Sequence, residues 1–157
     1  MKSLVVYATT SGNTRTIANA IADELRRRGP VELIEADLAQ ARLPEADVVF
    51  IGGPTEGHTM TKPLVRLFDR LEPGSLKGVA VAAFDTRLDW PRLLSGSAAA
   101  GIAKRLKAAG ARSSAPPESF IVSMKPELEP GETVRAAAWA ANVADAVAAQ
   151  MPEAARH

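Results

Sequence analysis

The junction between residues 4 and 14 constrains the fold of this chain more than any other stretch. Leu4–Ala8 is a continuous apolar run of strand length, which is typical of a strand covered on both faces. After Thr14 the apolar residues recur at the spacing of an amphipathic helix: Ile17, Ala18, Ile21, Ala22 and Leu25. A buried strand therefore enters a helix through a short polar turn, which is the building block of a parallel sheet covered by helices.

The polar turn, residues 9–14, has the chemistry of an anion-binding site. Hydroxyl groups, an Asn amide and the free backbone N–H groups of a helix N-terminus meet there, and the helix dipole also favours an anion. Gly12 allows the backbone to turn sharply and to approach a ligand closely. The turn has no Lys and lacks the Walker spacing, so we expect neutral hydrogen bonds and the dipole to hold a phosphate. The alternative is an ordinary capped turn between strand and helix.

This turn resembles the phosphate loop of flavodoxins, which is commonly written T-x-[ST]-G-N-T and directly follows the first strand. The resemblance implies FMN as the cofactor, with its phosphate held by Thr9, Thr10, Ser11, Gly12, Asn13 and Thr14. Pro117–Val122 and Glu129–Glu132 also resemble the C-terminal part of short flavodoxin-family proteins. The resemblance therefore spans nearly the whole chain.

A second loop follows the strand expected at residues 47–53. It resembles the loop of flavodoxin-like proteins that contacts the isoalloxazine ring, which implies cofactor contacts from Pro54, Thr55, Glu56, Gly57 and His58. Gly57 would permit a peptide flip toward a flavin ring nitrogen, or it merely relieves a turn. His58 either borders the ring or is an exposed loop residue, since this loop lacks the aromatic residue that many electron carriers place there.

A third loop, residues 84–98, aligns with the remaining flavin-binding loop of the family. The resemblance implies cofactor contacts from Asp85, Thr86, Arg87 and Trp90. Trp90 either stacks on the flavin ring or packs as a lid on the hydrophobic core. For Arg87 the alternatives are the phosphate, the O2 region of the flavin, or a surface ion pair with Asp85 or Asp89, and we favour the ion pair.

The rest of the chain alternates strands and helices. We expect further strands at residues 31–34, 47–53 and 79–84, and a fifth strand, 111–115 and 119–122, interrupted by Pro116-Pro117. Helices are expected after a capping Thr61 and at residues 97–109 and 131–150, whereas the crossover at 38–46 is expected to be short or irregular. Trp139, in the last helix, is expected to pack between helix and sheet.

This alternation implies an α/β fold with a parallel sheet and helices on both faces. The resemblance implies a flavodoxin-like three-layer sandwich with about five parallel strands in the order 2-1-3-4-5. We expect residues 1–150 to form a single domain and residues 151–157 to form a flexible tail.

Composition excludes several classes of function. The chain has no cysteine, so disulfides and thiol chemistry are excluded, and any electrons must be carried by a bound cofactor. A net charge of +1, from 19 basic and 18 acidic residues, argues against a nucleic-acid binder and departs from the acidic flavodoxins. With no membrane-length apolar run and no signal peptide, we expect a cytoplasmic protein. No catalytic triad or metal-ligand spacing stands out.

We therefore predict an FMN-binding electron-transfer protein, a carrier rather than a catalyst with its own acid and base residues. Two alternatives are an FMN-dependent quinone-type reductase and a non-enzymatic interaction protein of the same fold that binds flavin weakly or not at all. The expected partner is an unidentified redox protein, with no nucleic acid and no membrane involved, and the chain is expected to be a monomer or small homo-oligomer.

Overall fold

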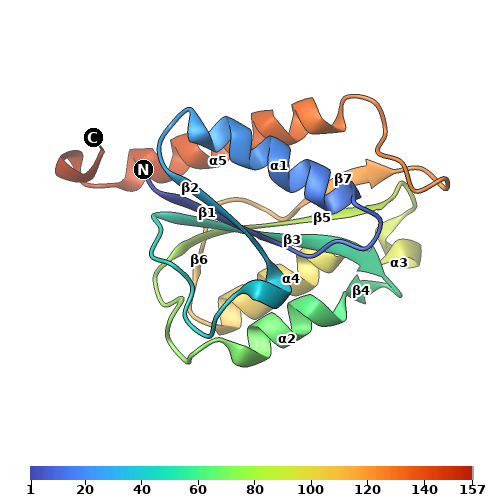
Figure 1. The fold of residues 1–157 in the computed structure, drawn as a ribbon, viewed down its shortest axis with the longest axis horizontal. Helices are drawn as coiled ribbons and strands as arrows, with labels where there is room; N and C mark the ends of the chain where they lie inside the picture. The colour runs from blue at the N-terminus through green and yellow to red at the C-terminus, as the bar shows by residue number, and fades with distance from the viewer. Residues whose placement is uncertain (157) are drawn as a thin grey trace.

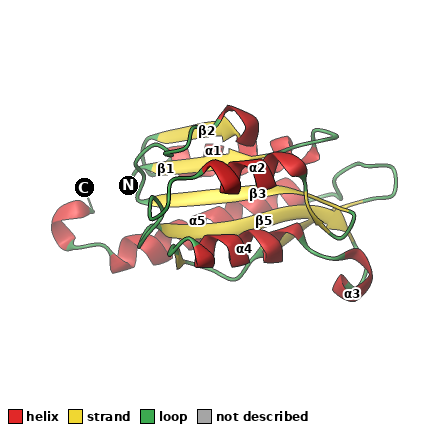
Figure 2. Cartoon of the chain, turned by 90° about the horizontal axis from the view of Figure 1, so that it is seen from below, coloured by secondary structure: helices red, strands yellow, loops and turns green. Residues whose placement is uncertain are grey.

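The computed structural model describes residues 1–156 and contains a parallel sheet at its centre. The sheet runs β2-β1-β3-β5, and two short strands continue it beyond β5 (Figure 2). The strands are β1 (Ser3–Tyr7), β2 (Val31–Glu35), β3 (Val48–Glu56), β4 (Thr59–Met60), β5 (Ala80–Leu88), β6 (Arg112–Ser113) and β7 (Glu118–Val122). With the hairpin strand β4 left out and β6 and β7 taken together, the order is the predicted 2-1-3-4-5.

The interrupted fifth strand is confirmed. β6 pairs with the first part of β5 and β7 with its last part, both in parallel. The two short strands flank Pro116-Pro117, whose missing N–H groups cannot extend the ladder. Because β7 runs parallel to the last part of β5 and ends opposite Leu88, the chain after β7 starts at the same end of the sheet as the loop after β5.

Helices cover both faces of the sheet, which confirms the three layers. α1 (Asn13–Arg26) and α5 (Glu132–Gln150) lie on one face, and α2 (Lys62–Arg70) and α4 (Ala98–Ala108) on the other (Figure 1). A four-residue helix, α3 (Arg92–Ser95), precedes α4, and the short helices η1 (Ala36–Leu38) and η2 (Glu153–Ala155) complete the chain. The predicted irregular crossover at residues 38–46 is confirmed, because only η1 interrupts it. No helix of the described residues is long and apolar enough to cross a bilayer.

The alternating side chains of the strands divide the core into two clusters. Leu4, Val49 and Ile51 face α2 and α4, whereas Phe50 and Phe84 face α1 and α5. Trp139 of α5 completes the second cluster, as predicted. Its ring meets those of Phe50, Phe84 and Phe120 edge-on, with centroid distances of 5.5, 6.1 and 5.9 Å.

Two local predictions are wrong. The third strand does not end at Gly53, because β3 continues to Glu56 and turns back into β4. Thr61 occupies the N-cap position of α2, but its side chain makes no capping hydrogen bond. Its hydroxyl is buried without a partner in the described structure.

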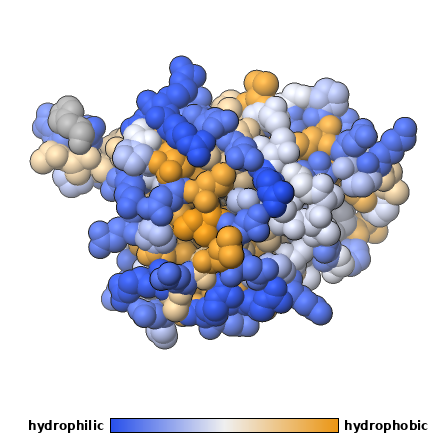
Figure 3. Space-filling view, viewed as in Figure 1, coloured by the Kyte–Doolittle hydropathy of each residue, from blue (hydrophilic) through white to orange (hydrophobic). Residues whose placement is uncertain are grey.

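On the face shown in Figure 3, the largest apolar area lies over β2, the edge strand of the sheet. Val31, Leu33 and Ile34 of β2 are only partly buried, and Leu38 of η1 is exposed. The loops that leave the carboxyl ends of the strands gather at another end of the molecule, away from both chain termini (Figure 1).

Candidate cofactor site at the carboxyl ends of the strands

The loops that follow β1, β3 and β5 emerge together at one end of the sheet (Figure 1). In open α/β sheets, ligands bind outside the carboxyl ends of the strands, where the strand order reverses. Here β1 and β3 are neighbours, and the chain leaves them toward opposite faces, into α1 and α2. The three loops predicted to bind the cofactor therefore share the position that the topology favours.

The loop after β1 leads into unpartnered backbone N–H groups at the start of α1. The N–H groups of Asn13, Thr14 and Arg15 begin α1 and have no hydrogen-bond acceptor among the described residues. Gly12 has a φ of 92°, and its own N–H donates to the Thr9 hydroxyl at 3.0 Å. The first turn of α1 contains no acidic residue and no side-chain cap. These features leave the positive end of the helix dipole free for an anion such as a phosphate.

Thr14 and Thr86, both predicted to touch the cofactor, bind each other. Their hydroxyl oxygens lie 2.8 Å apart, and both residues are buried between α1 and β5. This contact joins the first and third loops across 72 residues of sequence. The Thr14 and Thr86 side chains are therefore engaged with each other, and the Thr14 N–H has no acceptor among the described residues.

A fourth segment, residues 123–129, reaches the phosphate loop and was missed by sequence reasoning. The Asn13 side-chain amide donates to the carbonyl of Pro126 at 2.7 Å and to the Ser11 hydroxyl at 3.1 Å. A bridge between Val122 and Leu128 folds this segment into a narrow hairpin. The only sequence signal for it is the pair of prolines, 126 and 130, which indicate turns but not where the turns point.

The second predicted loop is a tight hairpin. Thr55 pairs with Met60 and Glu56 with Thr59, and Gly57 and His58 form the turn with φ values of 53° and 70°. Two consecutive residues with positive φ are the mark of a type I′ turn, whose twist suits the flanking strands. His58 is exposed at the tip. The hairpin holds Pro54–His58 above the end of the sheet more rigidly than an open loop would.

Asp85 ties this hairpin to the start of α4. The carboxylate is fully buried, and its Oδ2 accepts hydrogen bonds from the Thr55 hydroxyl, the Ser97 hydroxyl and the Ala99 N–H, at 3.0, 2.9 and 2.9 Å. The Thr55 hydroxyl in turn accepts from the Ala98 N–H at 2.8 Å. A carboxylate at a helix N-terminus is favoured by the dipole. Asp85 and Thr55 therefore fix two loops relative to each other beneath the candidate ring site.

The third loop is organised by Arg87. Its Nη1 donates to the carbonyls of Leu88 and Trp90, at 3.1 and 2.9 Å, and to the Ser95 hydroxyl at 3.4 Å. The predicted ion pair with Asp85 or Asp89 is wrong, because no salt bridge among the described residues involves Arg87. Three backbone and hydroxyl oxygens surround the guanidinium instead, and the loop curls around it.

Trp90 is 48% exposed, so the alternative in which it forms a lid on the core is wrong. Its loop and the hairpin enclose a small pocket of about 170 Å³. The pocket is lined by Thr55, Gly57, His58, Arg87, Leu88, Trp90, Leu94 and Ser95. The second and third predicted loops therefore meet at one hollow, with an indole and an imidazole at its rim.

The flavodoxin family model matches residues 5–118. This chain belongs to the flavodoxin family. A curated flavodoxin from Maridesulfovibrio salexigens is 36% identical over 89 residues, an alignment that covers 53% of this chain and 61% of that protein. Members of the family bind FMN and transfer electrons to redox partner proteins.

Solved flavodoxins share the fold of this one. Flavodoxin 2 from Bacillus cereus aligns with a TM-score of 0.78 at 26% identity, over 92% of this chain and 99% of that one. A flavodoxin from the domain Archaea aligns with a TM-score of 0.74 at 23% identity, over 94% and 99%. The likeness to the archaeal protein, at this identity, concerns the fold alone.

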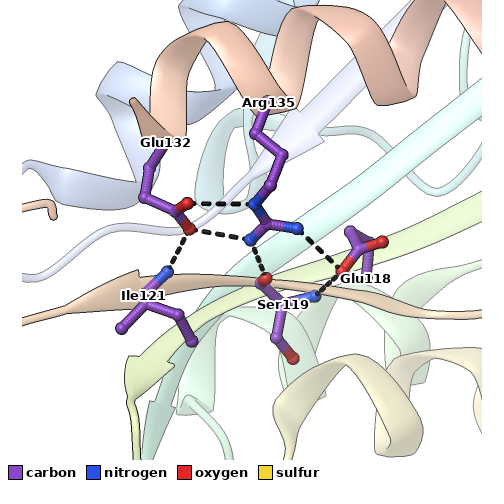
Figure 4. Close-up of polar contacts among 5 residues, drawn as sticks. All are labelled: Glu118, Ser119, Ile121, Glu132 and Arg135. Atoms are coloured by element: carbon purple, nitrogen blue, oxygen red, sulfur yellow. Dashed lines mark hydrogen bonds and ion pairs between the residues drawn. The ribbon is translucent and has the colours of Figure 1, made fainter. Parts of the chain in front are cut away.

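A partly buried ion-pair cluster anchors the segment that reaches the phosphate loop of this flavodoxin (Figure 4). Arg135 of α5 donates to both carboxylate oxygens of Glu132, at 2.9 and 2.7 Å, and to Glu118 at 3.1 Å. Glu132 also accepts the Ile121 N–H at 2.6 Å. The pKa of Glu132 is lowered, chiefly because Arg135 donates to the carboxylate, while burial opposes the change. The cluster clamps the start of α5 onto β7.

The lowered pKa of Glu132 predicts an acid-sensitive contribution to stability. Its stabilisation is fully present above the unfolded carboxyl pKa of about 4.3 and is lost as the pH falls through the lower folded value. Glu132→Gln should reduce the unfolding free energy at pH 7 by about 1–2 kcal/mol. Urea unfolding between about pH 7 and pH 3 should show that the variant loses less stability on acidification than the parent does.

Glu129→Gln is the matched control, since the Glu129 side chain makes no hydrogen bond among the described residues. It should follow the parent at every pH. If the unfolding free energies of Glu132→Gln and of the parent fell by the same amount on acidification, the acid-sensitive contribution would not come from Glu132.

Proposed function

We propose that this chain binds FMN and serves as an electron carrier between redox proteins. The observation that carries the proposal is the start of α1, where three unpartnered N–H groups stand at a helix N-terminus beside hydroxyl side chains. That donor set fits a dianionic phosphate that receives no lysine. Family membership supports the same cofactor.

Each loop has a distinct part in this proposal. The Thr9–Thr14 segment holds the phosphate through backbone N–H groups and hydroxyls. The hairpin tip at Gly57 and His58 and the indole of Trp90 frame the ring, since all three line the same pocket. The hydrogen bonds of Thr55, Asp85 and Thr86 fix these loops relative to one another. When bound, FMN supplies the redox chemistry, and the protein contributes binding, orientation and local electrostatics.

The nearest alternative is a quinone-type reductase, which would use the same FMN cofactor. The other alternative is a non-enzymatic interaction protein that binds flavin weakly or not at all. The carrier is favoured because the described loops place no buried acid or base at the open side of the pocket: His58 is exposed, and Asp85 lies beneath α4. A reductase would reduce a quinone with NADH or NADPH in the absence of any partner protein, which provides a direct distinction.

The proposal is tested by the visible spectrum of the purified protein and by titration of the apo form with FMN and with riboflavin. We expect sub-micromolar quenching of FMN fluorescence. Riboflavin, which lacks the phosphate, should bind on the order of a hundredfold more weakly, because charge-assisted hydrogen bonds to the loop are lost. Equal affinities would show that residues 9–14 are not a phosphate site, and no binding of either compound would remove the electron-carrier function.

A further inference from the structure

The pocket of about 170 Å³ between the hairpin and the Trp90 loop, called the ring pocket below, is lined by the Arg87 guanidinium, which has no anionic partner among the described residues. Some arginines of this chain pair with carboxylates, such as Arg15 with Glu35 at 2.7 Å and Arg105 with Asp69 at 2.6 Å, whereas Arg70 donates only to backbone carbonyls. Arg87 instead donates only to carbonyls and one hydroxyl, and its Nε is buried without a partner in the described structure. Because those acceptors are neutral, the positive charge of Arg87 is not cancelled where it lies.

Neither neighbouring carboxylate forms an ion pair with Arg87. Asp85 stands two residues earlier on β5, but its Oδ2 is taken up by Thr55, Ser97 and Ala99, and no ion pair links it to Arg87. Asp89 is exposed and makes no side-chain contact with Arg87. The wall of the pocket therefore carries the positive charge of Arg87 without an ion-pair partner.

Arg87 also determines the shape of the loop. α3 buries none of its residues, and Leu93 and Leu94 are 95% and 60% exposed, so apolar burial does not hold this segment in place. The Arg87 guanidinium donates to Leu88, Trp90 and Ser95. The Ser95 hydroxyl also donates to the Trp90 and Gly96 carbonyls, at 3.4 and 3.0 Å, and the Trp90 N–H donates to the Leu88 carbonyl at 2.8 Å. The guanidinium therefore shares in fixing the Trp90 backbone.

We infer that Arg87 is a positioning residue that holds the Trp90 loop and, through its uncancelled charge, makes the site favour reduced over oxidised FMN. The inference rests on the proposed function. Reduction adds electrons to the isoalloxazine ring, and the negative charge that results is stabilised by a cation fixed beside the ring in a partly desolvated pocket. The redox potential of this flavodoxin is accordingly raised by its own arginine.

Two substitutions separate the charge from the clamp. Arg87→Gln removes the charge, and Arg87→Lys keeps the charge but lacks the planar fork that reaches three acceptors. Arg92→Gln is the matched control, because it removes one positive charge from the same loop at an exposed residue whose side chain makes no hydrogen bond or ion pair among the described residues. For each protein we would measure anaerobically the dissociation constants of oxidised and dithionite-reduced FMN, and the two-electron midpoint potential of the bound flavin.

Arg87→Gln should weaken the binding of reduced FMN about tenfold more than that of oxidised FMN, as expected when one unit charge facing another is removed. For a two-electron couple this is a fall of about 30 mV in midpoint potential. Arg87→Lys should keep the ratio of the two constants within about twofold of the parent while both affinities fall, and Arg92→Gln should leave the ratio unchanged. An unchanged ratio in Arg87→Gln, or an equal shift in Arg92→Gln, would overturn the charge effect.

The clamp has a readout that needs no flavin. Trypsin cleavage after Arg92 in the apo protein should be roughly fivefold faster in Arg87→Gln and Arg87→Lys than in the parent, because the loop then opens more often. Equal rates would overturn the positioning role. If the parent binds no FMN, the proposed function fails and the charge effect with it, whereas the trypsin rates still decide the clamp.

Discussion

Thr10→Asp should abolish most of the FMN affinity of this flavodoxin while leaving its fold intact. Thr10 is exposed in the phosphate loop and makes no hydrogen bond among the described residues, so its replacement disturbs no contact. A carboxylate about 6 Å from a phosphate dianion, at an effective dielectric constant of about 40, costs about 2–3 kcal/mol. Fluorescence titration should therefore show a loss on the order of a hundredfold in FMN affinity.

Thr10→Asn is the control, because it has nearly the same shape as the Asp variant without the charge, and it should lose only the contribution of the Thr10 hydroxyl, about fivefold in FMN affinity. The difference between the two variants should shrink as salt is added, since exposed charges are screened. Thermal stability of Thr10→Asp should be unchanged or slightly raised, because a carboxylate near a helix N-terminus is favourable. A Thr10→Asp protein that binds FMN like the parent would refute the phosphate site.

Gly96→Ala should give the largest loss of stability and should disturb the ring pocket as well. Gly96 has a φ of 71°, and a Cβ added there would lie 2.2 Å from the His58 carbonyl oxygen and 2.5 Å from its Cα. Because both obstacles are backbone atoms, either the hairpin tip or the start of α4 must move. We expect the unfolding free energy in urea to fall by about 3–4 kcal/mol, of which about 1 kcal/mol comes from the left-handed backbone conformation.

Gly74→Ala isolates the backbone part of this cost. Gly74 has a φ of 78°, but nothing lies within 4 Å of its hypothetical Cβ. Its substitution should cost only about 1 kcal/mol and leave FMN affinity unchanged, whereas Gly96→Ala should weaken FMN about tenfold. Equal losses in the two variants would mean that the contact between Gly96 and the hairpin carries no weight.

Residues that act through short-range patterns were predictable from the sequence. The strand, turn and helix around Gly12, the break at Pro116-Pro117 and the packing of Trp139 all follow from periodicity and from backbone rules that act within a few residues. The three loops were correctly brought to one end of the sheet, because parallel strands send their carboxyl ends in the same direction. The hairpin at Gly57 and His58 was missed, since His is a rare choice for a left-handed turn position.

The amino-acid pattern was enough to predict the order of the elements, the two faces of the sheet and the donor chemistry of the phosphate loop, because each of these depends on burial and hydrogen bonding between near neighbours. Which polar groups meet across the fold could be seen only in the three-dimensional structure. Thr14 finds Thr86 across 72 residues, and Asn13 finds Pro126 across 113. Likewise Arg87 donates to carbonyls of its own loop rather than to a carboxylate, because the Asp85 carboxylate accepts hydrogen bonds from the start of α4 instead.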